Sequence, residues 1–132
     1  MSDANIQVVK EIYERFRAGD GDGFLARLSD DVYWDHRGPA GPAFNKVYEG
    51  KAAVGEFLSE LAAAEEALVL EDREYFANGD RVVVLGFMRF RAVTTGKEWE
   101  SDFAMAMTVR DSLVTHWRVL FDMGLEANAI KG

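Results

Sequence analysis

The sequence contains no cysteine, only two prolines, fewer basic than acidic residues and no long apolar run. Without cysteine, disulfide frameworks, thiolate metal sites and cysteine nucleophiles are excluded. The 15 Lys and Arg against 23 Asp and Glu leave a net charge of −8. This charge argues against nucleic-acid binding, because phosphate contacts need a basic face. No apolar run approaches the ~20 residues of a membrane span, and Met1 to Asn5 lack the features of a signal peptide. We therefore expect a cytoplasmic protein without membrane contact.

What is present is an aromatic-rich, globular composition. The chain has 132 residues, of which 48% are hydrophobic, including nine Phe and three Trp. This length and composition predict one folded domain over residues 1–132, with a single buried core.

Two helical patterns open the chain. Ser2 or Asp3 can cap a first helix, in which apolar residues recur on one face. The Gly-Asp-Gly-Asp-Gly segment at 19–23 breaks this helix, and Asp22 can cap a short second helix that carries apolar residues up to Leu28.

The second half of the chain has mainly β patterns. A third helix follows Gly50 and ends in Glu65 and Glu66, which we expect to be solvated. Alternating apolar residues then predict strands at 67–77, 81–93, 98–109 and 113–122. Three N-terminal helices packed on a strongly curved antiparallel sheet make an α+β fold. Such a sheet forms a cone with an open mouth, a concavity that favours a pocket.

A short strand before the third helix ends in Trp34, Asp35 and His36, and a loop with both prolines, Pro39 and Pro42, follows it. A titratable ring beside such a loop is typical of a ligand site. His36 is therefore the candidate catalytic residue, and its alternative is a ring bonded to the loop backbone without a chemical role.

Four segments resemble the SnoaL-like branch of the nuclear transport factor 2-like superfamily. They are Arg17–Gly23, Leu28–Val32, Tyr48–Val54 and His116–Asp122. The resemblance covers nearly the whole chain and implies the cone-shaped α+β barrel named above. It is specific for fold and weak for function, because one fold hosts many chemistries.

The resemblance also implies which side chains point into the cone. On the last three long strands these are Val84, Gly86, Met88 and Phe90, then Ser101, Phe103, Met105 and Met107, then Trp117, Val119 and Phe121. A slip of one residue would turn His116 and Arg118 inward and expel Trp117. The expected ligand-binding residues are Tyr13, Trp34, Phe57, Met88, Phe103, Met105, Trp117 and Val119.

Three enzyme templates of the superfamily fit this chain poorly. The ketosteroid isomerase pattern implies His36 at the position of the base, but Ile12 and Met105 where the two oxyanion donors belong. The limonene-epoxide hydrolase pattern places Gly86, Met88 and Val119 at its Asp, Arg and Asp positions. The polyketide cyclase pattern places Val119 and Met105 at its Asp and His positions. Only the His36 position keeps a group that can move a proton.

No cofactor or metal ion is expected. The two histidines, His36 and His116, have no carboxylate at ligand spacing. The glycine-rich segment at 19–23 lacks the glutamate and spacing of a calcium loop.

Three functions remain open. The first is isomerase- or cyclase-type acid–base chemistry by His36 on a small hydrophobic molecule; a metal-free hydrolase-like reaction belongs to the same class. The second is a non-catalytic binding module for such a ligand, and the third is a structural homodimer or accessory subunit. We expect a homodimer through the outer sheet face, which would hold Leu85, Phe87, Arg89, Ala104, Ala106, Arg118 and Leu120.

Overall fold

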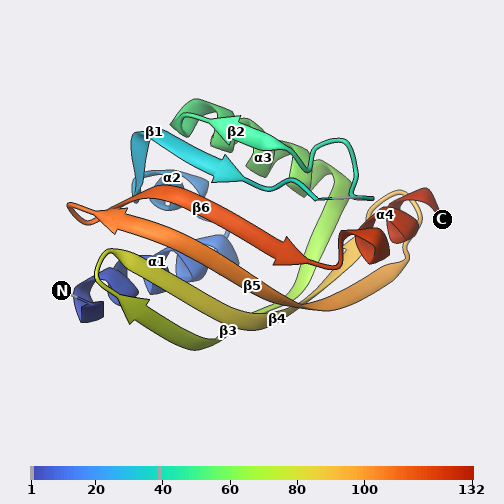
Figure 1. The fold of residues 1–132 in the computed structure, drawn as a ribbon. Helices are drawn as coiled ribbons and strands as arrows, with labels where there is room; N and C mark the ends of the chain where they lie inside the picture. Colours follow the sequence, from blue (N-terminus) through green and yellow to red (C-terminus); the bar gives the residue numbers. More distant parts are fainter. Residues whose placement is uncertain (1, 39) are drawn as a thin grey trace.

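The computed structural model describes residues 2–38 and 40–132 and contains four helices and six strands among them. Helices α1, α2 and α3 lie on one side of a curved sheet, and helix α4 lies at its end (Figure 1). The elements in chain order are α1 (Ser2–Arg17), α2 (Gly21–Leu25), β1 (Leu28–Asp35), β2 (Val47–Glu49), α3 (Lys51–Ala64), β3 (Glu65–Asn78), β4 (Arg81–Ala92), β5 (Glu98–Arg110), β6 (Leu113–Phe121) and α4 (Met123–Lys131).

The six strands form one sheet in the order β2-β1-β6-β5-β4-β3. This unclosed, curved sheet with helices on one side confirms the predicted α+β cone. One pairing differs from the expected antiparallel sheet, because β1 and β6 run parallel. The short strand β2, which the sequence patterns did not indicate, pairs with β1.

The curvature of the sheet arises from irregular pairing between β3 and β4. Their register shifts between Ala67 and Val69 and again between Asp72 and Glu74, and such bulges bend a strand. At the second bend Gly86 lies so close to its neighbours that a Cβ there would be 2.1 Å from the carbonyl oxygen of Glu71. The tight bend therefore requires glycine at this position.

The inward and outward faces of the long strands match the predicted phase. Burial alternates along β4, with Val84, Met88 and Phe90 buried. On β6, Trp117 and Val119 are buried. The phase with Trp117 inside the cone is therefore confirmed, and the slip by one residue does not occur.

The helix starts differ from the predicted ones. Helix α1 already includes Ser2, so Asp3 lies in its first turn and not before it. Helix α2 is capped by Asp20 and not by Asp22, because the Asp20 side chain accepts a hydrogen bond of 2.9 Å from the Gly23 amide. Leu28 lies outside this helix, at the start of β1.

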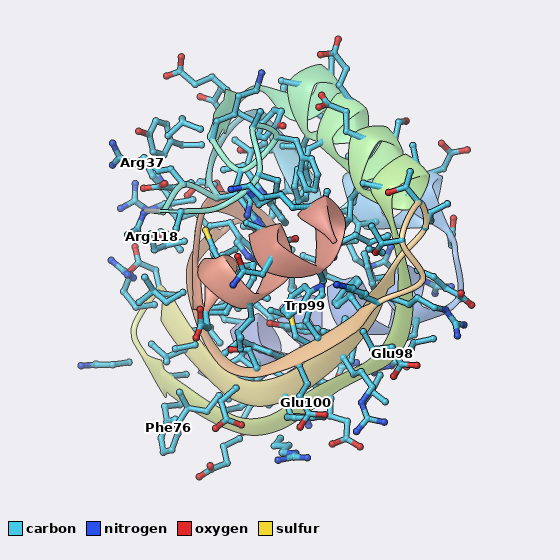
Figure 2. The ribbon with its side chains drawn as sticks, turned by 90° about the vertical axis from the view of Figure 1, so that its right-hand side faces the viewer. Arg37, Phe76, Glu98, Trp99, Glu100 and Arg118 are labelled. Carbon is cyan, nitrogen blue, oxygen red and sulfur yellow. The ribbon has the colours of Figure 1, made fainter. Side chains whose placement is uncertain are left out.

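A fourth helix, α4, follows β6 and was not predicted. The Asp122 side chain caps it by accepting a hydrogen bond of 3.2 Å from the Leu125 amide. Figure 2 shows α4 lying across the open end of the curved sheet. The predicted open mouth of the cone is therefore covered by this helix.

The loop after β1 packs against α4. A Cβ at Gly38 would meet the Met123 sulfur at 2.6 Å, and a Cβ at Gly41 would be 3.2 Å from the same sulfur. Pro39, one of the two prolines singled out in this loop, lies outside the described residues. None of the helices over residues 2–38 and 40–132 is long and apolar enough to cross a membrane.

Candidate functional site

The cone contains an apolar cavity between the sheet and helices α1 to α4. It holds about 600 Å³ of space free of protein atoms, part of it open to solvent. Seven of the eight residues expected to bind a ligand line it, together with His36: Tyr13, Trp34, Phe57, Met88, Met105, Trp117 and Val119. The eighth, Phe103, lies behind Tyr13, with the two rings stacked at a centroid distance of 6.1 Å.

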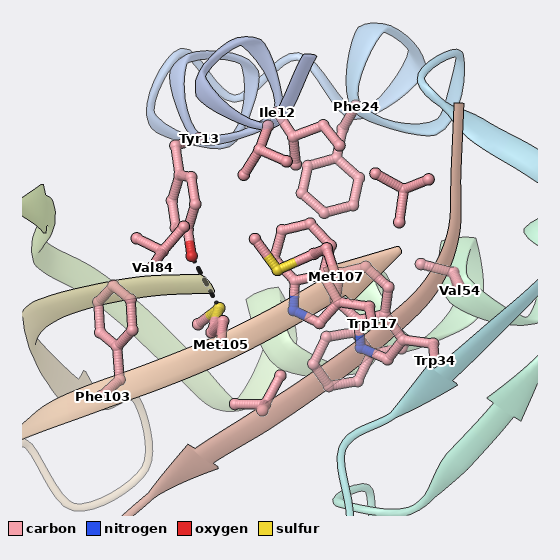
Figure 3. Close-up of a cluster of buried hydrophobic side chains, with 14 of the residues drawn as sticks. Ile12, Tyr13, Phe24, Trp34, Val54, Val84, Phe103, Met105, Met107 and Trp117 are labelled. Carbon is pink, nitrogen blue, oxygen red and sulfur yellow. Dashed lines mark hydrogen bonds between the residues drawn. The ribbon is translucent and has the colours of Figure 1, made fainter. Parts of the chain in front are cut away.

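Two tryptophans form the floor of this cavity (Figure 3). Trp34 on β1 and Trp117 on β6 are register partners in the parallel pair, and their rings stack with centroids 4.6 Å apart. The indole Nε1 atoms of both residues are buried without a hydrogen-bond partner among the described residues. Because an unmet buried donor costs about 1–3 kcal/mol, these two N–H groups favour a ligand that brings hydrogen-bond acceptors.

His36 follows β1 directly and is only 8% exposed. Its ring lies 4.6 Å from the centroid of Phe57 and 5.8 Å from that of Phe121. Burial lowers the pKa of His36 to about 4, although the charge of the neighbouring Asp35 acts in the opposite direction. His36 is therefore neutral near pH 7. Its Nδ1 has no hydrogen-bond partner in the described part of the chain, so the predicted alternative of a bond from this atom to the loop is absent there.

Tyr13 packs in the core and presents its hydroxyl inside the cone. The hydroxyl donates a hydrogen bond of 2.9 Å to the Met105 sulfur (Figure 3). Burial raises the pKa of Tyr13 well above its ordinary value, so the phenol stays protonated. Because sulfur is a weak acceptor, this hydroxyl can change partner for a ligand oxygen.

A pair of buried carboxyl groups, Glu65 and Glu126, lies at the α4 end of the cavity and was missed by the sequence analysis. Glu126 on α4 is 2% exposed and Glu65 at the start of β3 is 3% exposed. The expectation that Glu65 is solvated is therefore wrong. Its carboxylate accepts a hydrogen bond from the indole N–H of Trp99, and Asn45 donates to Glu126 Oε1 at 2.6 Å.

Burial raises the pKa of Glu126 far above its ordinary value, and a hydrogen bond to Glu65 and the charge of Glu65 raise it further. Glu126 is therefore a neutral carboxylic acid near pH 7. Glu65 was predicted as part of an exposed Glu-Glu pair because its neighbour Glu66 is indeed on the surface. Glu126 lies in the helix that was not predicted, so its position beside the cavity had no signal in the sequence.

Asp35 is held in a buried ion pair on the far side of β1 from the cavity. Arg118 on β6 lies 2.9 Å from its carboxylate and Arg37 lies 3.1 Å away. Burial alone would raise the pKa of Asp35, but the hydrogen bonds and charge of Arg37 and the charge of Arg118 outweigh it and lower the pKa. Asp35 is not the solvated carboxylate that strand alternation indicates, and its partners position the end of β1 beside His36.

The template positions in the cone carry the apolar groups expected from the sequence. Met88, Met105 and Val119 line the cavity, and Gly86 is closed off by the ring of Phe103, 2.4 Å from where a Cβ would lie. Across residues 2–38 and 40–132, no group of three His, Asp or Glu side chains is placed to hold a metal ion.

Comparisons with known proteins place this geometry in context. A family model described as a SnoaL-like domain matches residues 9–117. An NTF2-like protein from Burkholderia xenovorans LB400 is 32% identical, with 98% of both chains covered and a TM-score of 0.87. TerC, co-crystallised with polyporic acid, is 28% identical over 98% of this chain and 99% of that chain, with a TM-score of 0.85. A proposed polyketide cyclase from Xanthomonas campestris, 24% identical over 98% of both chains at a TM-score of 0.84, is similar in fold. No curated protein matches the chain.

Proposed function

The chain belongs to the SnoaL-like domain family, and we propose that it binds a small, flat, largely apolar molecule in the cone and performs isomerase- or cyclase-type acid–base chemistry on it with His36. The observation that carries this proposal is a neutral, buried imidazole with an unpartnered nitrogen, described above, in the wall of an aromatic cavity.

The shape and polarity of the cavity support a flat ligand with few polar groups. Stacked rings, Trp34 and Trp117, offer a planar apolar surface. The unpartnered N–H groups of these two residues suit carbonyl or hydroxyl oxygens on the ligand. The similarity to TerC, which was co-crystallised with polyporic acid, supports the same class of ligand.

The protonation state of His36 limits the reaction. A neutral imidazole can accept a proton, but a ring whose pKa is lowered to about 4 is a weaker base than free imidazole. The ligand therefore needs an acidic proton, as on a carbon next to a carbonyl group. Removal of that proton leaves an enolate, and its return to another carbon completes an isomerisation or ring closure.

A test uses 2-tetralone, a flat apolar ketone with acidic protons beside its carbonyl, as a probe in deuterium oxide. The wild-type protein should accelerate exchange of these protons for deuterium, measured by proton NMR, and His36→Ala should return the rate to the buffer background. His116→Gln, at an exposed position on β6, is the matched control and should exchange like the wild type. Background exchange in the wild type, or full exchange in His36→Ala, would contradict the proposal.

Non-catalytic binding is the second candidate, favoured by the apolar residues at the template positions, such as Met105 and Val119. It predicts that 2-tetralone binds to the wild-type protein and to His36→Ala alike and that neither accelerates exchange. The same experiment therefore separates the two candidates.

We also propose that two copies of the chain pair through the outer sheet face. Leu120 is 50% exposed there and Leu85 is 37% exposed. The same face carries the Arg89–Glu100 ion pair, so it offers apolar area and both signs of charge to a second copy.

A further inference from the structure

The cone lacks the oxyanion donors of the isomerase template, yet it contains one carboxylic acid that is protonated near pH 7. Glu126 lines the same cavity as His36. It comes from α4, which covers the end of the cone (Figure 2). The Glu65–Glu126 pair is not an isolated acidic cluster, because His36 Nδ1, 92% buried by its residue's exposure of 8%, faces the same cavity without a partner in the described residues.

The contacts of Glu126 indicate which of its oxygens carries the proton. Asn45 donates to Oε1 at 2.6 Å, so Oε1 acts as the acceptor. The O–H group is then at Oε2, where it donates to the carboxylate of Glu65. A carboxyl group with this arrangement is oriented by one neighbour and kept protonated by the other.

Glu65 can give up this hydrogen bond without losing all its partners. Its carboxylate also accepts the indole N–H of Trp99, a residue that itself lines the cavity. A ligand oxygen that reaches Glu126 therefore competes for a proton whose present acceptor has a second donor. Because donors already oriented toward developing negative charge stabilise an enolate strongly, one such group has a large effect on rate.

We infer that Glu126, positioned by Asn45 and Glu65, is the acid of the cone and donates a hydrogen bond to the carbonyl or enolate oxygen of a ligand whose acidic proton lies beside His36. This inference rests on the proposed function. It assigns a base and an acid to the two cavity-lining groups whose surroundings favour opposite protonation states, a neutral imidazole and a neutral carboxyl. It also narrows the ligand to a molecule with a carbonyl oxygen, and not a hydrocarbon.

The variant Glu126→Gln tests this role with little change in shape. The amide can still accept from Asn45 and donate to Glu65, so the fold and the position of α4 should be kept. The proton of the acid is lost. Glu100→Gln, on the outer face of β5 in an ion pair with Arg89, is the matched control.

Two readouts with 2-tetralone are needed. The first is the infrared carbonyl stretch of the bound ketone, which a strong donor shifts to lower frequency. Glu126→Gln should move it back toward the frequency of a weaker donor, and His36→Ala should leave it unchanged. The second is the deuterium exchange rate at saturating ketone, which should fall about tenfold or more in Glu126→Gln, by comparison with the loss of an oxyanion donor. The control variant should match the wild type in both readouts.

The outcomes distinguish this inference from the function on which it rests. If the wild type neither binds 2-tetralone nor accelerates exchange, the proposed function fails. If it does both and Glu126→Gln changes neither the carbonyl frequency nor the rate, only the role of Glu126 is overturned. Equal losses of ketone affinity and protein stability, with an unchanged rate at saturation, would likewise show that Glu126 is merely structural.

Discussion

The rings of Trp34 and Trp117 stack at a centroid distance of 4.6 Å and an interplanar angle of 17° (Figure 3). They do so because they are direct register partners of the parallel strands β1 and β6. Each indole N–H is buried beside the cavity and has no hydrogen-bond partner in the described part of the chain. This pair links the topology of the sheet to the chemistry of the ligand.

The first prediction concerns these N–H groups. Trp117→Phe keeps an aromatic ring but removes the donor. We expect the affinity for 2-tetralone to fall about threefold to tenfold, the range of one net hydrogen bond. The affinity for tetralin, the same skeleton without a carbonyl, should fall no further than the lost ring area requires. Isothermal titration calorimetry measures both, and equal losses for the two probes would contradict the donor role.

The second prediction concerns His36 and acid stability. Because burial lowers its pKa from 6.5 to about 4, the unfolded chain binds this proton at higher pH than the folded protein. Stability from this group is full above pH 6.5 and is lost as the pH falls toward 4, by up to about 3 kcal/mol. Urea unfolding at several pH values should show that His36→Gln reduces this loss, whereas His116→Gln does not. An equal slope in both variants would contradict the lowered pKa.

The third prediction concerns Glu126 and has the opposite sign. Its folded pKa is raised above the ordinary value of 4.5, so its contribution to stability is present at low pH and is lost as the pH rises above 4.5. Glu126→Gln cannot ionise and should therefore gain stability over the wild type as the pH is raised from 7 to 9. Thermal unfolding across this range measures the difference. A wild type that stays ahead of the variant by a constant margin would contradict a buried neutral acid.

The fourth prediction concerns the bend of the sheet. Gly86→Ala would place a Cβ 2.1 Å from the Glu71 carbonyl oxygen and 2.4 Å from the Phe103 ring. We expect it to destabilise the fold by about 1–3 kcal/mol, the usual cost of overpacking. Gly21→Ala is the control, because nothing lies within 4 Å of a Cβ there. Unfolding in urea compares the two, and similar stabilities would show that the bend tolerates a side chain.

The fifth prediction concerns self-association. Leu120→Glu places a charge in the centre of the proposed dimer face and should produce monomers in light scattering after size exclusion. Val93→Glu alters a residue that is 57% exposed beyond the end of β4 and should leave the dimer intact. A monomeric wild type would contradict the proposed pairing.

The sequence predicted the family, the α+β cone and the phase of its long strands. The family match confirms the resemblance seen in the motifs. Strand phase was accessible because side chains alternate with period two, so one residue such as Trp117 determines the face of its neighbours. The lining of the cavity followed from the same alternation, and only Phe103 lies one layer away.

What the sequence could not predict depends on contacts between distant segments. The parallel pairing of β1 and β6 joins residues more than eighty positions apart and has no local pattern. Glu65 looked like half of an exposed pair, and only its distant partners, Trp99 and Glu126, explain its burial. Helix α4 is short and has a glycine in its first turn, so its periodicity is weak.

The measurement that tests the central claim most directly is a crystal structure of the protein grown with polyporic acid. The account predicts the molecule inside the cone, with one face against Trp34, an edge beside His36 and an oxygen within hydrogen-bond distance of Glu126. A cone filled by its own side chains, with polyporic acid absent or bound only on the outer surface, would contradict it.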